Sequence, residues 1–110
     1  MRTAQQGGRW PTPPDWMDRC PECRRHYGVY RVAAGTVYLT QVTQRHIRVS
    51  THIVADHPDR VPDYVPGCRR CDEHHAATAQ TRATSAAMLH AAAVHRAGHL
   101  YAPADAARLI

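Results

Sequence analysis

The clearest pattern of apolar and polar positions lies over residues 46–53, where the two kinds of residue alternate strictly. Such alternation predicts a β-strand with one buried face and one solvated face. Two further strand patterns cover residues 29–34 and 36–43, and Gly35 marks a tight turn between them. Together these three segments predict a small antiparallel β-meander with one buried face and one solvent-exposed face.

A long helix is predicted after the meander, from about residue 72 to residue 99, because this stretch contains no proline and has alanine at helical spacing. Asp72 and Glu73 stand where acids favour a helix start, and Gly98 is a plausible end. The alanine stripe allows a close neighbour, either the sheet of the same chain or a helix of a partner protein. The predicted fold class is therefore α+β, a meander plus one long C-terminal helix.

Composition divides the chain into three parts. Residues 1–17 are rich in proline and glycine and are expected to form a flexible arm, residues 18–101 the domain, and residues 102–110 a short tail. Trp10 and Trp16 are unusual in such an arm. They are expected either to pack back onto the domain or to anchor a partner.

The core of this domain is expected to be thin. The chain has 110 residues, 44% of them hydrophobic, but much of that share is alanine and phenylalanine is absent. Burial contributes only about 25 cal/mol per Å² of apolar surface, so a small alanine-rich core needs a further stabilising link. The four cysteines are the obvious source of that link.

Two CxxC pairs, Cys20 with Cys23 and Cys68 with Cys71, predict one structural zinc ion held by four thiolates. No apolar stretch of about 20 residues is present, and the first residues do not read as a secretory signal. A cytoplasmic, reducing compartment is therefore expected, and there such pairs favour metal over disulfides. A rubredoxin-like iron site, a redox-active CxxC and two disulfides are the alternatives.

The order of a CPEC knuckle, a meander and a CRRC knuckle at a helix start resembles the treble-clef zinc finger. The resemblance covers about residues 20–99. It implies that Cys20 and Cys23 come from a knuckle and that Cys68 and Cys71 come from the first turn of the helix. A zinc ribbon is the rival fold, although its second knuckle normally lies in a hairpin.

The chain is basic, with a formal charge of +5, and all fourteen basic residues are arginine. Four thiolates around one Zn²⁺ carry −2, which would lower the charge to +3. The arginines beside the knuckles and on the predicted sheet either form a patch for phosphates or offset the thiolates. The predicted binding residues are Arg24, Arg25, Arg31, Arg48, Arg69, Arg70, Trp10 and Trp16, with His46, His52 and Tyr30 or Tyr38 as extensions of the patch.

Nine histidines raise the question of catalysis. The layout faintly resembles HNH nucleases, a resemblance that implies His52 or His57 as general base and His74 as metal ligand. The chain has no asparagine, and Asp72 stands where that family has a histidine, so solvent-facing histidines are the preferred interpretation. His95 and His99 have the i, i+4 spacing for a shared metal, but no further ligand for them is evident.

These observations favour a non-enzymatic zinc-finger module that binds nucleic acid or a protein of the transcription machinery. The alternative is a structural or protein-interaction subunit that docks through its helix and its tryptophan-bearing arm, and an HNH-like nuclease is the third hypothesis. Neither a membrane nor a small-molecule substrate is expected. The Ala-, Arg- and Pro-rich composition suggests a GC-rich bacterium or one of its phages.

Overall fold

The computed structural model describes residues 10–80 and 85–107, and this part of the chain is built from helices without a single strand. The α+β prediction with a β-meander is therefore wrong. No helix within these residues has both the length and the apolar character needed to cross a bilayer. The elements in chain order are α1 (Asp15–Arg19), α2 (Pro21–Ala34), α3 (Leu39–Asp56), the 3-10 helix η2 (Pro58–Arg60), α4 (Arg69–Gln80), α5 (Ala86–Gly98) and α6 (Ala104–Ala107).

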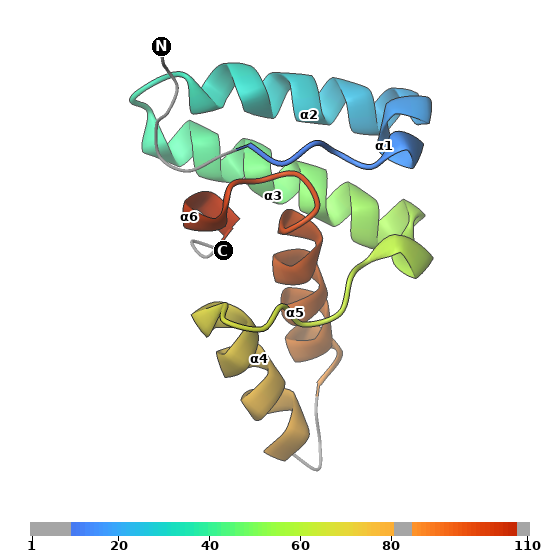
Figure 1. Cartoon of the computed structure of the whole chain (residues 1–110), viewed down its shortest axis with the longest axis vertical. Helices are drawn as coiled ribbons and strands as arrows, with labels where there is room; N and C mark the ends of the chain where they lie inside the picture. Colours follow the sequence, from blue (N-terminus) through green and yellow to red (C-terminus); the bar gives the residue numbers. More distant parts are fainter. Residues whose placement is uncertain (1–9, 81–84, 108–110) are drawn as a thin grey trace.

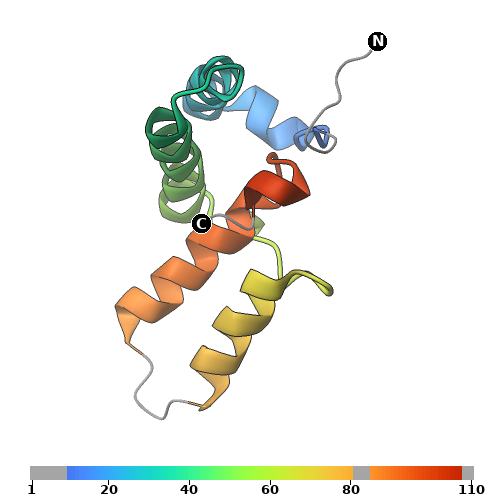
Figure 2. The same ribbon diagram turned by 90° about the vertical axis from the view of Figure 1, so that its left-hand side faces the viewer.

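Two helical hairpins make up most of the molecule. Helices α2 and α3 lie side by side and antiparallel, and α4 and α5 form a second pair (Figure 1). Helix α5 packs against α3, so that it joins the two hairpins, and the turned view shows α4 beside α5 but away from α2 (Figure 2). Ala92 and Ala97 of α5 are buried in this packing, whereas Ala79, Ala86 and Leu89 of the predicted Ala-rich stripe are exposed.

Residues 46–53 form the middle of α3 and not a strand, because polar and apolar residues share its buried face. His46, Val49, Ser50 and Ile53 are all buried, and they recur at the 3–4 residue spacing of a helix. Ile47, which alternation would bury, is 41% exposed. The alternating pattern was misleading because His46 and Ser50 were counted as solvated.

A hydrogen-bonded tyrosine explains how these polar residues can be buried. The hydroxyl of Tyr101 donates to the backbone carbonyl of His46 at 2.8 Å and accepts from the Ser50 hydroxyl at 2.6 Å. Tyr101 is fully buried and packs edge-on against Tyr30, with ring centroids 5.6 Å apart. The core that ties α2, α3 and the end of α5 together is therefore centred on two tyrosines.

The single long C-terminal helix of the prediction is two helices. Ser85 has extended backbone angles and caps α5, since its hydroxyl accepts a hydrogen bond of 3.1 Å from the Met88 amide. Residues 81–84, which the prediction placed inside one helix, lie outside the described residues. Helix α5 does end at the expected Gly98, where a Cβ atom would meet Nε2 of His46 at 2.8 Å.

The described part of the N-terminal segment contacts the core. Met17 is 2% exposed, and Trp10 and Trp16 are partly buried against the same cluster. At the other end Ala102 and Ala107 are buried as well. Residues 1–9 and 108–110 lie outside the described part of the chain, and the division into arm, domain and tail stays a prediction.

Candidate metal centres

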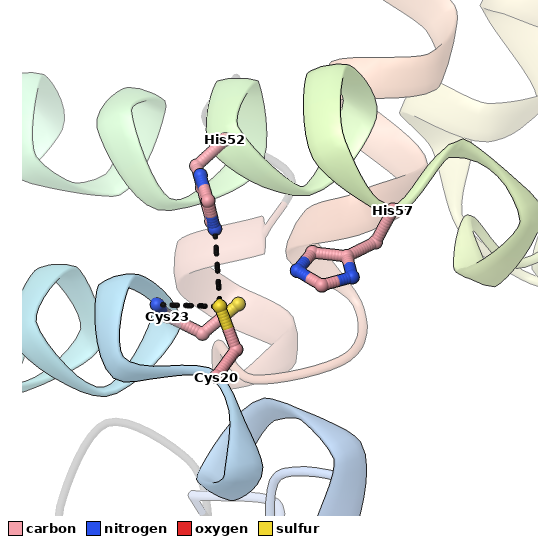
Figure 3. Close-up of side chains that lie close together, drawn as sticks. All are labelled: Cys20, Cys23, His52 and His57. Carbon is pink, nitrogen blue, oxygen red and sulfur yellow. Dashed lines mark hydrogen bonds between the residues drawn. The ribbon is translucent and has the colours of Figure 1, made fainter.

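The first centre joins the two ends of the α2–α3 hairpin. Cys20 is the N-cap of α2, Cys23 lies in its first turn, His52 lies in the last turns of α3 and His57 is the C-cap of that helix. Their ligand atoms all lie within 4.8 Å of one another. Both imidazoles face the two sulfur atoms (Figure 3).

The second centre repeats this arrangement in the α4–α5 hairpin. Cys68 directly precedes α4, Cys71 lies in its first turn, His95 lies in the last turn of α5 and His99 is its C-cap. These four ligand atoms also lie within 4.8 Å of one another. Each hairpin therefore gathers a Cys₂His₂ set from its first and last turns.

The distances within both centres are those of the edges of a zinc tetrahedron. With Zn–S of about 2.3 Å and Zn–N of about 2.0–2.1 Å, a sulfur and a nitrogen ligand lie roughly 3.6 Å apart and two nitrogens roughly 3.3–3.4 Å apart. The two Nε2 atoms of the second centre are 3.3 Å apart. The sulfur–nitrogen distances are Cys20 to His52 3.6 Å, Cys68 to His95 3.4 Å and Cys71 to His99 3.5 Å.

In each centre a backbone amide donates a hydrogen bond to the sulfur atom of the first cysteine. The amide of Cys23 donates to Cys20 Sγ and the amide of Cys71 donates to Cys68 Sγ, both at 3.4 Å. The Cys23 amide, followed by His52, lowers the pKa of Cys20 to about 6. Burial raises the pKa of Cys23 to about 12, so this thiol loses its proton only when a cation is bound.

The histidines of the first centre are arranged as metal ligands. Oδ2 of Asp56 lies 3.1 Å from Nδ1 of His52, and this carboxylate therefore keeps the proton on Nδ1 while Nε2 faces Cys20. Nε2 of His57 is buried and has no hydrogen-bond partner among the described residues. A metal ion would satisfy that orphaned nitrogen.

The histidines of the second centre are held neutral, as metal ligands must be. Burial lowers the pKa of His95 to about 4 and also lowers the pKa of His99. Two thiolates with two neutral imidazoles are a common donor set of structural zinc. The residues of both centres thus fit this ion.

The structure corrects the predicted grouping of the cysteines. It divides them between two centres, each completed by histidines, so the expected Cys₄ site with one ion is replaced by two Cys₂His₂ groups. Both CxxC pairs lie at helix starts and no strand accompanies them in the described residues, so the treble-clef fold is not formed.

The prediction assigned no histidine as a zinc ligand, although it noted the metal-binding spacing of His95 and His99 and the sequence carries a further signal. Each CxxC pair is followed after one helical hairpin by two histidines four or five positions apart, His52 with His57 and then His95 with His99. Predicting strands over residues 29–53 hid this repeat, because it placed His52 on a solvated sheet face. His74, the alternative metal ligand, belongs to neither group.

The arginines predicted to bind a partner lie in several places. Arg25 and Arg48 line one groove between α2 and α3, together with Arg45, which the prediction omitted. The other four arginines contact residues elsewhere. Arg24 lies near Asp18, and Arg69 and Arg70 lie near Glu73, as ion pairs. Arg31 lies over the Trp10 ring and donates a hydrogen bond to the Tyr27 hydroxyl. Trp10 contacts Tyr30, and Trp16 contacts His57.

Comparison of the chain with protein-family models, curated proteins and solved structures gave no match. The two Cys₂His₂ groups and the helical hairpins that carry them are therefore the features of this chain that bear on its function.

Proposed function

We propose that this protein is a non-enzymatic nucleic-acid-binding module whose helical fold is held together by two structural zinc ions. The observation that carries the proposal is the pair of complete Cys₂His₂ groups. A catalytic zinc site keeps one coordination position open for water or substrate, whereas four protein ligands close the site. Both ions would therefore serve the fold.

Two zinc centres of this composition leave the basic charge of the chain intact. Two thiolates and one Zn²⁺ are together neutral, so the metal-bound protein keeps the formal charge of +5 of the metal-free chain. A single Cys₄ site would have lowered it. The arginines near the cysteines then have no excess negative charge to offset, which removes one of the two explanations for them.

The positive charge is concentrated in the first hairpin. Residues 21–56 contain five arginines and two acidic residues, a formal charge of +3. The remaining residues, 1–20 and 57–110, share the other +2. A basic surface on a rigid hairpin is the feature by which proteins attract the phosphate backbone.

A second function, docking to a protein, is favoured by one specific observation. The end of α2, the following turn and the start of α3 present large apolar side chains to solvent. They are Val32, Val37, Tyr38 and Leu39, with exposed fractions of 75%, 91%, 64% and 66%. Such a patch is typical of a protein contact, and its affinity for a partner would withstand high salt.

Nuclease activity has less support. His52 and His57, the two histidines considered as general base, both face the cysteines of the first centre. As zinc ligands they could not accept a proton from water.

The test has two parts. Elemental analysis of the purified, reduced protein is expected to give two zinc ions per chain. Fluorescence anisotropy with a labelled DNA duplex is then expected to show binding that weakens steeply between 50 and 200 mM salt, on the order of tenfold or more. Two zinc ions without any duplex binding would overturn the nucleic-acid function but not the zinc-held fold, and a protein without zinc would overturn that fold.

A further inference from the structure

An arginine-lined groove runs between α2 and α3. Its lining residues are Arg25, His26, Val29, Arg45 and Arg48. Two helices contribute to it, and the two arginines of α3 are three positions apart, a spacing that makes them neighbours on a helix surface. Three guanidinium groups therefore face one shallow space.

The cations of this groove are poorly neutralised. Arg45 and Arg48 form no ion pair within the described part of the chain, and Arg25 has only an exposed contact of 3.9 Å to Glu22. Such exposed contacts contribute little. Arg24 and Arg69 have exposed contacts of the same kind, to Asp18 and Glu73. Of the three groove arginines, Arg45 and Arg48 thus stand without an acidic partner in the described part of the chain.

From this geometry we propose that the groove binds phosphate groups of a double-stranded nucleic-acid backbone, an inference that rests on the proposed function and locates its binding site. The planar guanidinium group donates two parallel hydrogen bonds to phosphate oxygens, and three such groups can hold neighbouring phosphates.

Duplex backbone fits the lining better than single strands do. Proteins that bind single strands stack the bases on aromatic side chains, and this lining contains neither tyrosine nor tryptophan, with His26 as its one aromatic ring. Contacts of the guanidinium groups with phosphates carry no sequence information.

The first metal centre lies close to the groove along both helices. Arg25 follows Cys23 by two positions, and Arg48 precedes His52 by one helical turn. A zinc ion bound to Cys23 and His52 would clamp the two helices together beside these arginines. Metal at this centre would thereby preorganise the phosphate site.

The experiment compares two variants with the same loss of charge. Arg45→Gln with Arg48→Gln removes two groove cations, and Arg69→Gln with Arg70→Gln removes two cations of α4, the first exposed and the second half-buried. Each zinc-loaded protein is titrated by anisotropy with a labelled DNA duplex, an RNA duplex and a single-stranded DNA of equal length over a salt series. Zinc content and far-ultraviolet circular dichroism establish that each variant is folded.

The groove variant is expected to bind both duplexes at least tenfold more weakly than the parent protein. Its slope of log K against log salt is expected to be smaller by about two, because each lost phosphate contact lowers the slope by about one. The α4 variant is expected to keep most of the affinity. The two duplex arms show whether the site prefers the DNA or the RNA backbone.

The other outcomes separate the inference from the proposed function. If the parent protein binds no nucleic acid, both fail. If the parent binds duplex but the two variants lose affinity equally, the function stands and the groove is not the site. Tighter binding of the single strand would overturn the duplex preference.

Discussion

Asp56 and His52 lie 3.1 Å apart, carboxylate oxygen to Nδ1, on the side of the imidazole opposite Cys20. The carboxylate fixes the tautomer in which Nε2 is free to bind metal. Replacing Asp56 by asparagine is therefore expected to weaken zinc binding at the first centre by about 10–100-fold. Competition with a chromophoric chelator measures the affinity.

The matched control for this change is Asp59→Asn. Asp59 is an exposed acid close by in the chain, with a contact of 4.0 Å to Arg60. It is not among the ligands of either centre. Equal weakening by both changes would mean that general charge, and not the contact with His52, sets the affinity.

The two centres are expected to fill separately. Cys23→Ser removes one ligand of the first group, and Cys71→Ser removes one ligand of the second. Each variant should retain one zinc ion per chain by elemental analysis, because the other group keeps its four ligands. Loss of all zinc from either variant would instead indicate a single shared site.

Zinc affinity is expected to fall as the pH falls. In the metal-free protein burial raises the pKa of Cys23 to about 12 and also raises the pKa of Cys71, so both thiols are protonated at neutral pH. Zinc must displace these protons, and a lower pH favours the protonated, metal-free form. The dissociation constant should rise by at least about tenfold per pH unit between pH 8 and pH 6, since each displaced proton contributes about tenfold. An affinity that does not change over this range would contradict the assignment of thiolate ligands.

Tyr101→Phe tests the buried hydrogen bonds of the core. The change leaves the Ser50 hydroxyl and the His46 carbonyl without their partner, and it is expected to lower the free energy of unfolding by about 1–3 kcal/mol. Denaturant unfolding of the zinc-loaded protein measures it. Tyr38→Phe is the control, because Tyr38 is exposed and should change stability by less than about 0.5 kcal/mol.

Two glycines within helices are expected to respond to alanine in opposite directions. A Cβ at Gly98 would meet Nε2 of His46 at 2.8 Å, and His46 is itself buried, so Gly98→Ala should destabilise by about 1–3 kcal/mol. A Cβ at Gly28 has nothing within 4 Å, and there the better helix propensity of alanine should stabilise by about 0.5–1 kcal/mol. The same unfolding measurement compares them, and a stabilised Gly98→Ala protein would contradict the close approach of α5 to α3.

The sequence predicted the cysteines as metal-binding residues, and in the structure each CxxC pair lies with two histidines close enough to hold a metal ion. The CxxC spacing brings two thiols close together in different folds. Which histidines join each cysteine pair could not be predicted in the same way. That choice depends on which helix ends meet, and it follows from the packing of α3 against α2 and of α5 against α4. Because three strands were predicted in place of α2 and α3, the histidines were not expected at helix ends beside the cysteines.

The strand prediction failed for a chemical reason. Alternation treats every polar residue as solvated, but Ser50 is buried with its hydroxyl bonded to Tyr101, and His46 is buried between Tyr30 and Tyr101. Tyr101, the hydrogen-bond partner of Ser50, lies 51 residues farther along the chain. A local pattern contains no information about a partner so distant.

The helix-end position of every ligand has a consequence for how the chain reaches its native state. One ion would close the loop from Cys20 to His57 and the other the loop from Cys68 to His99, and these loops neither overlap nor enclose one another. Each ion therefore reduces the entropy of only its own segment of unfolded chain. Closing one loop therefore does not require the other loop to be closed, and the contact of α5 with α3 is the link between the two hairpins.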